Sequence, residues 1–384
     1  MKRLDIVCYT SKLCNLRCRY CYELPLLGDR TRMSLGAIER MFTNVALGFR
    51  GSAEPIGINF YWHGGEPLLI PPVFYREIFE LQRRVFSDSV HRVTNSIQSN
   101  FTVIDEDRIA LLREFDGVGV SLDLFGGLRV DLRGRNSEAR ALANLARVRE
   151  AGVAVAGITV LSRANVAHVR GIYEFYRSQR MRFRILPIEK GLYADGQPFE
   201  LGPHEVLAAY CDLLDLWLED DDPVAVKPLD RFLCLVIHAN RRASNRVDEY
   251  DPTRWPSALL VDTDGTVYTY GDRFGRRTGS LFETPLDRLL AGDGYRQTAL
   301  ETRQRMQRTC ERCEYYRRAC MGDPVGESCQ DFVEYDADGS VRCIVARGVI
   351  RHLERRLRER GTLADGSTHD EARVLAGRVD FAVA

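Results

Sequence analysis

Residues 14–21 read Cys14-Asn-Leu-Arg-Cys18-Arg-Tyr-Cys21 and directly follow an apolar run at Leu4–Tyr9 that predicts a first strand. Thiolates at this spacing on one tight loop can surround one corner of a [4Fe–4S] cubane. Three ligands for four irons leave one iron open, as a catalytic metal site requires. A zinc site or inert thiols are the alternatives, although structural zinc needs a fourth ligand and the adjacent sequence offers none.

Strand-like and helix-like segments alternate along the first half of the chain. Apolar, β-branched runs predict strands at Leu4–Tyr9, Ile56–Trp62, Val93–Gln98, Gly117–Leu122, Val153–Leu161 and Arg182–Pro187. Helical spacing predicts helices at Ser34–Leu47, Val73–Phe86, Glu106–Phe115, Glu138–Ala151 and Val166–Arg177. This alternation implies a parallel sheet with right-handed crossovers. We therefore expect an α/β fold, a partial (β/α)6 TIM-like barrel, with ligands at the carboxyl ends of the strands.

The second half of the chain predicts helices at 203–222 and Leu229–Asn240 and then a β-hairpin. Strands at Ala258–Asp262 and Thr266–Tyr270 flank Asp264-Gly265, a strong two-residue turn signal. Residues 301–343 hold five cysteines, and little periodic structure is expected there because metal replaces a hydrophobic core.

A last helix is expected at Ala346–Arg358, followed by a surface tail. These features divide the chain into a barrel at 1–225, a bridging region with the hairpin at 226–300, a small cysteine-rich auxiliary domain at 301–350, and a helical tail at 351–384.

Composition indicates a neutral protein without a nucleic-acid footprint, because Lys+Arg and Asp+Glu both total 54 among the 384 residues. No apolar stretch is long enough for a signal peptide or a membrane span, so a cytoplasmic protein without a membrane partner is expected. Eleven cysteines in such a chain favour metal ligands over disulfides. They gather near both ends, which predicts two metal sites.

Further motifs follow the predicted strands in order. They are Gly64-Gly65-Glu66-Pro67, Ser96-Ile-Gln98-Ser99-Asn100 and Val120-Ser121-Leu122-Asp123. With the cysteine loop, they resemble the radical S-adenosylmethionine (SAM) superfamily over nearly the whole chain. The resemblance implies that the open iron binds SAM and that one electron from the cluster yields a 5′-deoxyadenosyl radical. That electron would come from an external flavodoxin-type or ferredoxin-type donor.

The resemblance also implies cofactor-binding residues, which are Tyr20, Gly64, Gly65, Glu66, Gln98, Asn100, Ser121, Asp123 and Arg133. An aromatic ring at Tyr20 can pack against adenine, glycines let backbone approach a ligand, and Glu66 can accept from the cofactor's ammonium. Ser121 and Asp123 can instead cap a helix, and Arg133 and Arg135 can be surface arginines. Phe101 and Leu124 replace glycines that are usual in the family.

The C-terminal cysteines begin with Cys310-x2-Cys313-x6-Cys320 and continue to Cys329 and Cys343. Alone, this pattern can be a zinc knuckle. Beside the N-terminal motif it resembles the SPASM extension of radical SAM enzymes that modify peptides and proteins. The resemblance implies one auxiliary [4Fe–4S] cluster on Cys310, Cys313 and Cys320, with Cys343 as fourth ligand and Cys329 as the alternative.

A second auxiliary cluster, present in the fullest form of the extension, is expected to be absent. Two of its cysteine positions are occupied by Tyr270 and Pro324, neither of which can supply a thiolate.

Several segments, among them Trp62-His63-Gly64-Gly65-Glu66 and Ser340-Val-Arg-Cys343, resemble the cyclophane-forming maturases of ribosomally made peptides (RiPPs). The resemblance implies abstraction of a side-chain hydrogen in a precursor peptide and a bond from that β-carbon to an aromatic ring. Asp272 is the candidate base, or an ordinary turn aspartate, and His63 is a second, weaker candidate.

The barrel begins almost at Met1, so the peptide would be held by the barrel, by the 226–300 region or by a separate protein. Strand pairing with the hairpin edge is one such mode. Alternative functions are a radical dehydrogenase or epimerase acting on a protein side chain or small molecule, and a non-catalytic zinc-binding adaptor.

Overall fold

The computed structural model describes residues 2–50, 52, 54–87, 89, 91–188, 198–241, 251, 253–256, 258–269, 276–320, 322, 333–335 and 341–363. Within these ranges the backbone forms one sheet of ten strands and a separate sheet of two strands. The strand order in the large sheet is β10-β9-β8-β1-β2-β3-β4-β5-β6-β7.

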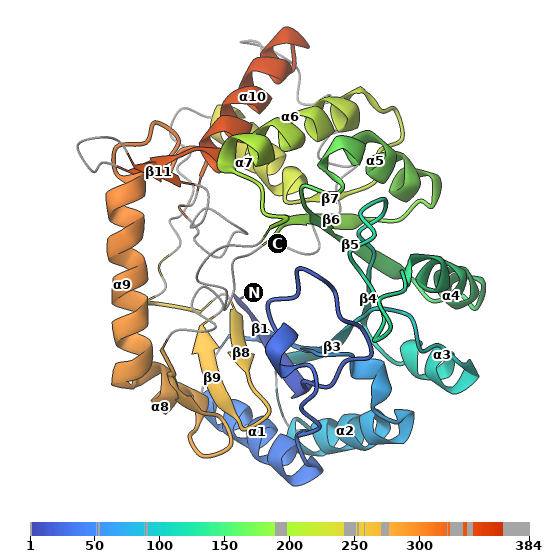
Figure 1. Ribbon diagram of the computed structural model, residues 1–384. Helices are drawn as coiled ribbons and strands as arrows, with labels where there is room; N and C mark the ends of the chain where they lie inside the picture. The colour runs from blue at the N-terminus through green and yellow to red at the C-terminus, as the bar shows by residue number, and fades with distance from the viewer. Residues whose placement is uncertain are drawn as a thin grey trace.

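The first six strands run parallel and in chain order. They are β1 (Lys2–Ser11), β2 (Ile56–Gly64), β3 (Arg92–Ser99), β4 (Gly117–Ser121), β5 (Val155–Leu161) and β6 (Phe183–Pro187). The helices that follow them are α1 (Leu35–Gly48), α2 (Pro72–Val85), α3 (Glu106–Leu112), α4 (Glu138–Glu150), α5 (Val169–Ser178) and α6 (Pro203–Glu219). Figure 1 shows these helices around the outside of the curved sheet, so the predicted partial (β/α)6 barrel is confirmed.

The strands place apolar and polar residues on opposite faces of the sheet. Leu4, Ile6 and Cys8 of β1 are fully buried in the core between sheet and helices. Each such Leu or Ile side chain contributes about 1.5–3 kcal/mol relative to an exposed one. Polar residues stand among the alternating positions: Asn59 Nδ2 of β2 donates to Asp5 Oδ1 of β1 at 3.0 Å. The inner face of the barrel therefore carries polar groups.

Local capping sets the starts of two barrel helices. The N–H of Ala37 donates to Ser34 Oγ at 3.2 Å ahead of α1, and the N–H of Arg108 donates to Asp105 Oδ1 at 2.9 Å ahead of α3. Such side-chain caps satisfy N–H groups that have no partner inside the helix. This is why the predicted starts of these helices agree closely with the observed ones.

The predicted hairpin is present and extends the barrel sheet. Strand β8 (Ala258–Val261) pairs antiparallel with β9 (Thr266–Thr269), and Gly265 takes a φ of +84° in the turn. Strand β8 also pairs in parallel with β1, which places the hairpin on the free edge of the barrel. A short strand β10 (Gly279–Ser280) covers Thr266 and Val267, so that part of the hairpin edge is not open to a peptide strand.

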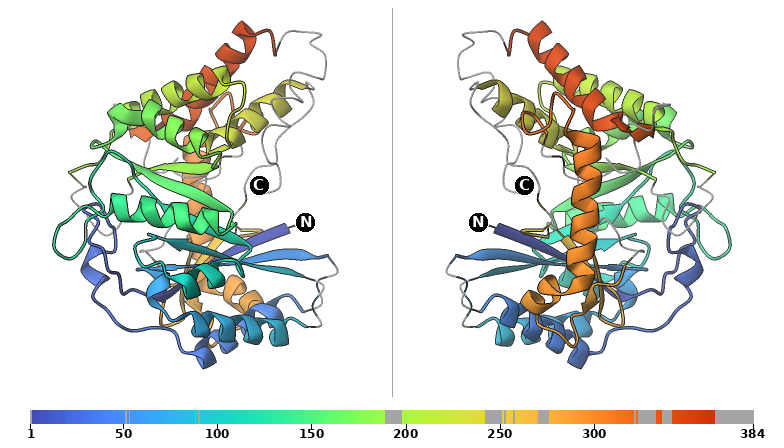
Figure 2. Two further views of the ribbon diagram at one scale, coloured as in Figure 1. Left: turned by 90° about the vertical axis from the view of Figure 1, so that its right-hand side faces the viewer. Right: turned by 90° about the vertical axis from the view of Figure 1, so that its left-hand side faces the viewer.

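The remaining elements complete the fold. They are β7 (Val226–Lys227), α7 (Leu229–Arg241), α8 (Leu286–Ala291), α9 (Asp293–Cys310), β11 (Val333–Tyr335), β12 (Val341–Cys343) and α10 (Val345–Glu359). Strand β7 pairs with β6, α10 packs against α6 and α7, and α8 packs against α1. Helix α9 runs along one side of the molecule from α8 to the β11–β12 pair (Figures 1 and 2).

The expectation of little periodic structure at residues 301–343 is wrong for its first ten residues, which form the end of the 18-residue helix α9. Most side chains of α9 are exposed or half-buried, and Leu300 is 48% exposed. A helix that buries only a narrow face needs no apolar stripe, so hydrophobic periodicity does not reveal it.

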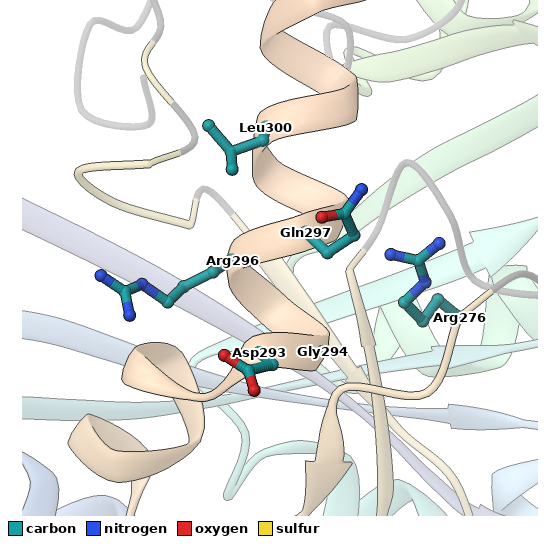
Figure 3. A pocket seen from close by; sticks show the side chains of 6 residues that line it. All are labelled: Arg276, Asp293, Gly294, Arg296, Gln297 and Leu300. Atoms are coloured by element: carbon teal, nitrogen blue, oxygen red, sulfur yellow. The ribbon is translucent and has the colours of Figure 1, made fainter.

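A pocket of about 550 Å³ lies beside the first turns of α9 (Figure 3), lined by Arg276, Asp293, Gly294, Arg296, Gln297 and Leu300. None of these residues belongs to the motifs singled out in the sequence.

Among the described residues, no helix is both long and apolar enough to cross a membrane.

Candidate functional site

The N-terminal cysteines lie on the loop after β1, at the carboxyl edge of the parallel strands. The N–H of Cys21 donates to the carbonyl of Cys18 at 3.0 Å, which folds these two residues into one turn. The N–H of Cys14 donates to the carbonyl of Leu27 at 3.1 Å, which closes the loop.

Burial raises the pKa of the Cys14 and Cys21 thiols to about 12 and also raises the pKa of Cys18. The negative charge of each neighbouring thiolate contributes to this rise, so the three sulfurs lie within electrostatic reach of one another. Thiols of this kind ionise when a metal centre supplies compensating positive charge. Three thiols on one loop are the donor type that a [4Fe–4S] cluster takes.

A neighbouring segment clamps the cysteine loop from the β4 side. The N–H groups of Arg17 and Arg19 donate to the carbonyls of Val130 and Leu128 at 2.7 and 2.9 Å. On the opposite side Lys12 forms an ion pair with Asp262 at 2.8 Å, which ties the loop to the β8–β9 hairpin. The loop is thus fixed by the segment after β4 and by the β8–β9 hairpin.

Gly64 and Gly65 bring the end of β2 against the cysteine loop. The N–H of Gly65 donates to the carbonyl of Ser11 at 2.9 Å. A Cβ on Gly64, whose φ is +117°, would lie 2.3 Å from the Ser11 carbonyl oxygen, and one on Gly65 would lie 2.3 Å from those of Lys12 and Leu13. Only glycine permits this approach of two backbones.

We expect Gly65→Ala to lower the free energy of unfolding by about 2–3 kcal/mol, because the new methyl overlaps carbonyl oxygens that cannot move freely. Gly28→Ala, in the same loop, is the matched control, since a Cβ there has no atom within 4 Å. Its effect should stay within about 0.5 kcal/mol. Denaturant unfolding of both variants measures the difference, and equal midpoints would contradict this explanation of the glycine pair.

Glu66 is 2% exposed and joins the ends of β2 and β3. Its Oε1 accepts from the N–H of Leu68 at 2.9 Å and from Ser99 Oγ at 2.8 Å, and its Oε2 accepts from the N–H of Asn100 at 2.8 Å. Burial raises its pKa, while these donors act to lower it. Asn100 Nδ2 in turn donates to Asn15 Oδ1 of the cysteine loop at 3.0 Å.

Gln98 and Ser121 belong to a polar row that crosses the inner face of the barrel. Tyr61 OH donates to Gln98 Oε1 at 2.9 Å, and Gln98 Nε2 donates to Ser121 Oγ at 2.8 Å. A Cβ on Gly119 would meet Gln98 Oε1 at 1.9 Å, so glycine on β4 leaves the space that Gln98 occupies.

Phe101 and Leu124 stand where the family's motifs have glycine, and both keep a glycine-like backbone. Their φ angles are +53° and +52°, in the left-handed region. Both side chains are buried, Phe101 fully and Leu124 to 3% exposure. Burial of these large side chains offsets the backbone strain.

Tyr20, Asp123 and Arg129 form a hydrogen-bonded group beside the cysteines. Tyr20 OH donates to Asp123 Oδ2, and Arg129 Nη1 donates to Tyr20 OH at 2.7 Å. The predicted Arg133, by contrast, is exposed, and Arg135 pairs with Asp131 at 2.7 Å. Arg129 was not among the predicted site residues, and no spacing or motif singles it out among the arginines of this segment.

The C-terminal cysteines lie around the end of α9. Cys310 ends α9, Cys313 and Cys320 lie on the segment that follows, and Cys343 ends β12. The N–H of Cys313 donates to the carbonyl of Cys310 at 2.9 Å. Burial is the largest cause that raises the pKa of Cys310 (to about 12), and negative charge on Cys320, Cys343 and Cys313 raises it further. These four cysteines therefore lie within electrostatic reach of one another.

Cys329 and Asp272, with Tyr270 and Pro324, lie outside the described residues. His63 lies between Tyr9 and Tyr61, with ring centroids 5.6 and 6.2 Å away. Among the described residues, no group of three or more His, Cys, Asp or Glu side chains is placed to hold a metal ion as it stands.

Comparison with known proteins shows what this arrangement is similar to. Residues 8–176 match the family model of the Radical SAM superfamily. The chain is 25% identical over 269 residues to a cysteine-type anaerobic sulfatase-maturating enzyme of Clostridium novyi, covering 67% of this chain and 70% of that protein. It is 27% identical over 333 residues to a serine-type enzyme of Klebsiella pneumoniae, covering 80% and 78%.

Solved structures share the fold. The structure of anSMEcpe with bound AdoMet and Cp18Cys peptide has a TM-score of 0.70 at 20% identity and covers 93% of this chain and 97% of that one. Streptococcus suis SuiB bound to precursor peptide SuiA has a TM-score of 0.55 at 14% identity and covers 77% and 66%.

The α/β fold of this chain is the radical SAM fold seen in anSMEcpe. Residues 8–176 are therefore similar to the Radical SAM superfamily, and the chain is similar to the anaerobic sulfatase-maturating enzymes over two thirds or more of its length.

Proposed function

We propose that this enzyme matures a ribosomally made precursor peptide by joining a side-chain β-carbon to an aromatic ring of the same peptide. The observation that carries the proposal is the pair of cysteine groups. Cys14, Cys18 and Cys21 lie at the carboxyl edge of the barrel, and Cys310, Cys313, Cys320 and Cys343 gather at the end of α9.

Two sets of side chains would hold the cofactors. Cys14, Cys18 and Cys21 would bind the cluster at the barrel, and Cys310, Cys313, Cys320 and Cys343 would bind the auxiliary cluster, with Cys329 as the spare. When bound, SAM and the barrel cluster would supply a 5′-deoxyadenosyl radical that takes a hydrogen atom from the substrate. The auxiliary cluster would supply an acceptor for one further electron.

A crosslink to an aromatic ring requires both steps, the removal of a hydrogen atom and the removal of one further electron. Forming the carbon–carbon bond removes one hydrogen atom from the β-carbon, and restoring the aromatic ring then releases one electron and one proton. The proton needs a base within hydrogen-bond reach. Asp272, which follows the hairpin, is the residue we propose for that role.

The chain's own residues would position SAM and the peptide. The Glu66 carboxylate is anchored by Ser99 and by the N–H of Asn100, so it offers a fixed negative charge at the carboxyl edge of the strands. The row Tyr61–Gln98–Ser121 offers fixed polar groups on the inner face of the barrel. Fixed polar groups orient a ligand without having to rearrange as it reacts.

The structures that share the fold support a peptide substrate. SuiB has been solved bound to precursor peptide SuiA, and anSMEcpe has been solved with the Cp18Cys peptide. A barrel of the same shape in this chain would present its open carboxyl edge to a peptide in the same way.

Anaerobic co-expression with each short reading frame beside the gene tests the proposal. The expected product has lost two hydrogen atoms and does not fragment between the two joined residues in tandem mass spectrometry. A Cys18→Ala enzyme is the control, and the peptide should then keep its full mass. A product that has lost two hydrogens but fragments at every peptide bond would contradict a crosslink.

A second candidate is oxidation of one side chain without a crosslink. The names of the related proteins favour it, because they are cysteine-type and serine-type sulfatase-maturating enzymes and the alignments cover two thirds or more of both chains. The same mass spectra separate the two candidates, since an oxidised residue carries the entire mass loss on one position.

A further inference from the structure

Arg129 is held beside the N-terminal cysteines by two residues that come from different parts of the barrel. Its Nη1 donates to Tyr20 OH at 2.7 Å and lies 3.8 Å from Asp123 Oδ2. The side chains of Arg129 and Asp123 are only 17% and 5% exposed. Tyr20 stands between Cys18 and Cys21 in the sequence, so the guanidinium is fixed to the cysteine loop itself.

The backbone on both sides of Arg129 is hydrogen-bonded to the cysteine loop. The N–H of Arg19 donates to the carbonyl of Leu128 at 2.9 Å, and the N–H of Arg17 donates to the carbonyl of Val130 at 2.7 Å. Arg129 is therefore fixed beside Cys18, which stands between Arg17 and Arg19 in the sequence. Charges in such a poorly hydrated place are weakly screened.

We propose that Arg129 is a positioning residue that sets the reduction potential of the SAM-binding cluster, by holding a fixed positive charge beside its thiolate ligands. Tyr20 and Asp123 keep the guanidinium in place through its hydrogen bond and ion pair. The proposal depends on the [4Fe–4S] cofactor and is independent of the peptide substrate.

The physical basis is the charge of the cluster. Three thiolates give it a net negative charge, and adding an electron increases that charge. A nearby positive charge stabilises the reduced form more than the oxidised form, so it raises the reduction potential. Removing Arg129 should make reduction harder, and removing Asp123 should make it easier.

The experiment is a potentiometric titration of the reconstituted full-length enzyme, followed by electron paramagnetic resonance in the absence of SAM. Leaving SAM out separates the effect of the charge on the cluster from any effect on cofactor binding. For Arg129→Met we expect the equilibrium constant for reduction to fall about tenfold, which is about 59 mV for one electron. Asp123→Asn should shift the potential in the opposite direction.

Two references control for general disturbance of the structure. The auxiliary cluster of each variant is an internal reference whose potential should not move, and SAM addition identifies which signal belongs to the barrel cluster. Arg177→Met is the matched variant, because Arg177 donates to Asp220 at 2.8 Å and Tyr173 OH donates to the same carboxylate at 2.6 Å. This group repeats the residue types of Tyr20, Asp123 and Arg129 but packs on α5 and α6, away from the cysteines.

Arg129→Lys should retain most of the native potential, because it keeps the charge. If Arg129→Met fails to take up the cluster, the lysine and Asp123→Asn variants carry the test on their own. The proposal is overturned if the barrel cluster of Arg129→Met has the same reduction potential as that of Arg177→Met. It is also overturned if Asp123→Asn lowers the reduction potential.

Discussion

Cys18→Ala is expected to abolish 5′-deoxyadenosine formation and to remove about four of about eight irons per chain. The variant deletes one of three thiolates proposed to hold the barrel cluster, and two thiolates from one loop cannot replace it. Cys18 is 8% exposed and lies in a small apolar cluster with Leu16 and Leu128, against which the other two thiols of the loop pack. Iron and sulfide analysis together with chromatography of the SAM cleavage products measures the effect.

Cys211→Ala is the control for loss of a thiol as such. Cys211 is half-buried on α6 and belongs to neither cysteine group. It should keep the full iron content and the native rate of SAM cleavage. A Cys18→Ala protein that still cleaved SAM at the native rate would contradict the proposal that the cysteine loop holds the SAM-binding cluster.

Cys343→Ala is expected to leave about four irons per chain and to uncouple SAM cleavage from product formation. The barrel cluster remains, so 5′-deoxyadenosine should still appear, while the crosslinked peptide should not. The reason is that Cys343, at the end of β12, lies within electrostatic reach of Cys310, Cys313 and Cys320. Iron analysis and peptide mass spectrometry on the same sample measure the two effects.

Cys329→Ala is the partner variant, because the sequence leaves both cysteines as candidates for the fourth ligand. It should keep about eight irons per chain and the native product. The reverse pattern, with iron lost in Cys329→Ala and retained in Cys343→Ala, would exchange the roles of these residues.

Much of the barrel could be predicted because its signals are local. The alternation of apolar residues in β1, with Leu4, Ile6 and Cys8 facing the helices, is visible in the sequence. Helix α9 was missed because it buries too little apolar surface to show a period. Hydrophobic periodicity records which face of an element is buried, and it is silent about elements that stay exposed.

The candidate site was predictable to the extent that its residues lie on motifs. Glu66, Gln98 and Asn100 follow strands in the expected order, and the structure connects Glu66 to Asn100 at 2.8 Å. Arg129 was not predictable, because nothing in the sequence distinguishes it from Arg133 four residues later. Burial separates them: one side chain points at Tyr20 and the other is exposed.

The amino-acid sequence alone determined what depends on neighbours along the chain: the spacing of Cys14, Cys18 and Cys21, the strand and helix periods, and the hairpin turn at Asp264-Gly265. The tertiary structure alone decided which distant segments meet. It pairs β8 with β1, sets Arg129 against Tyr20, and brings Cys343 toward Cys310. Local patterns are fixed by backbone geometry within a few residues, whereas these encounters depend on how whole elements pack, and no short stretch of sequence contains that information.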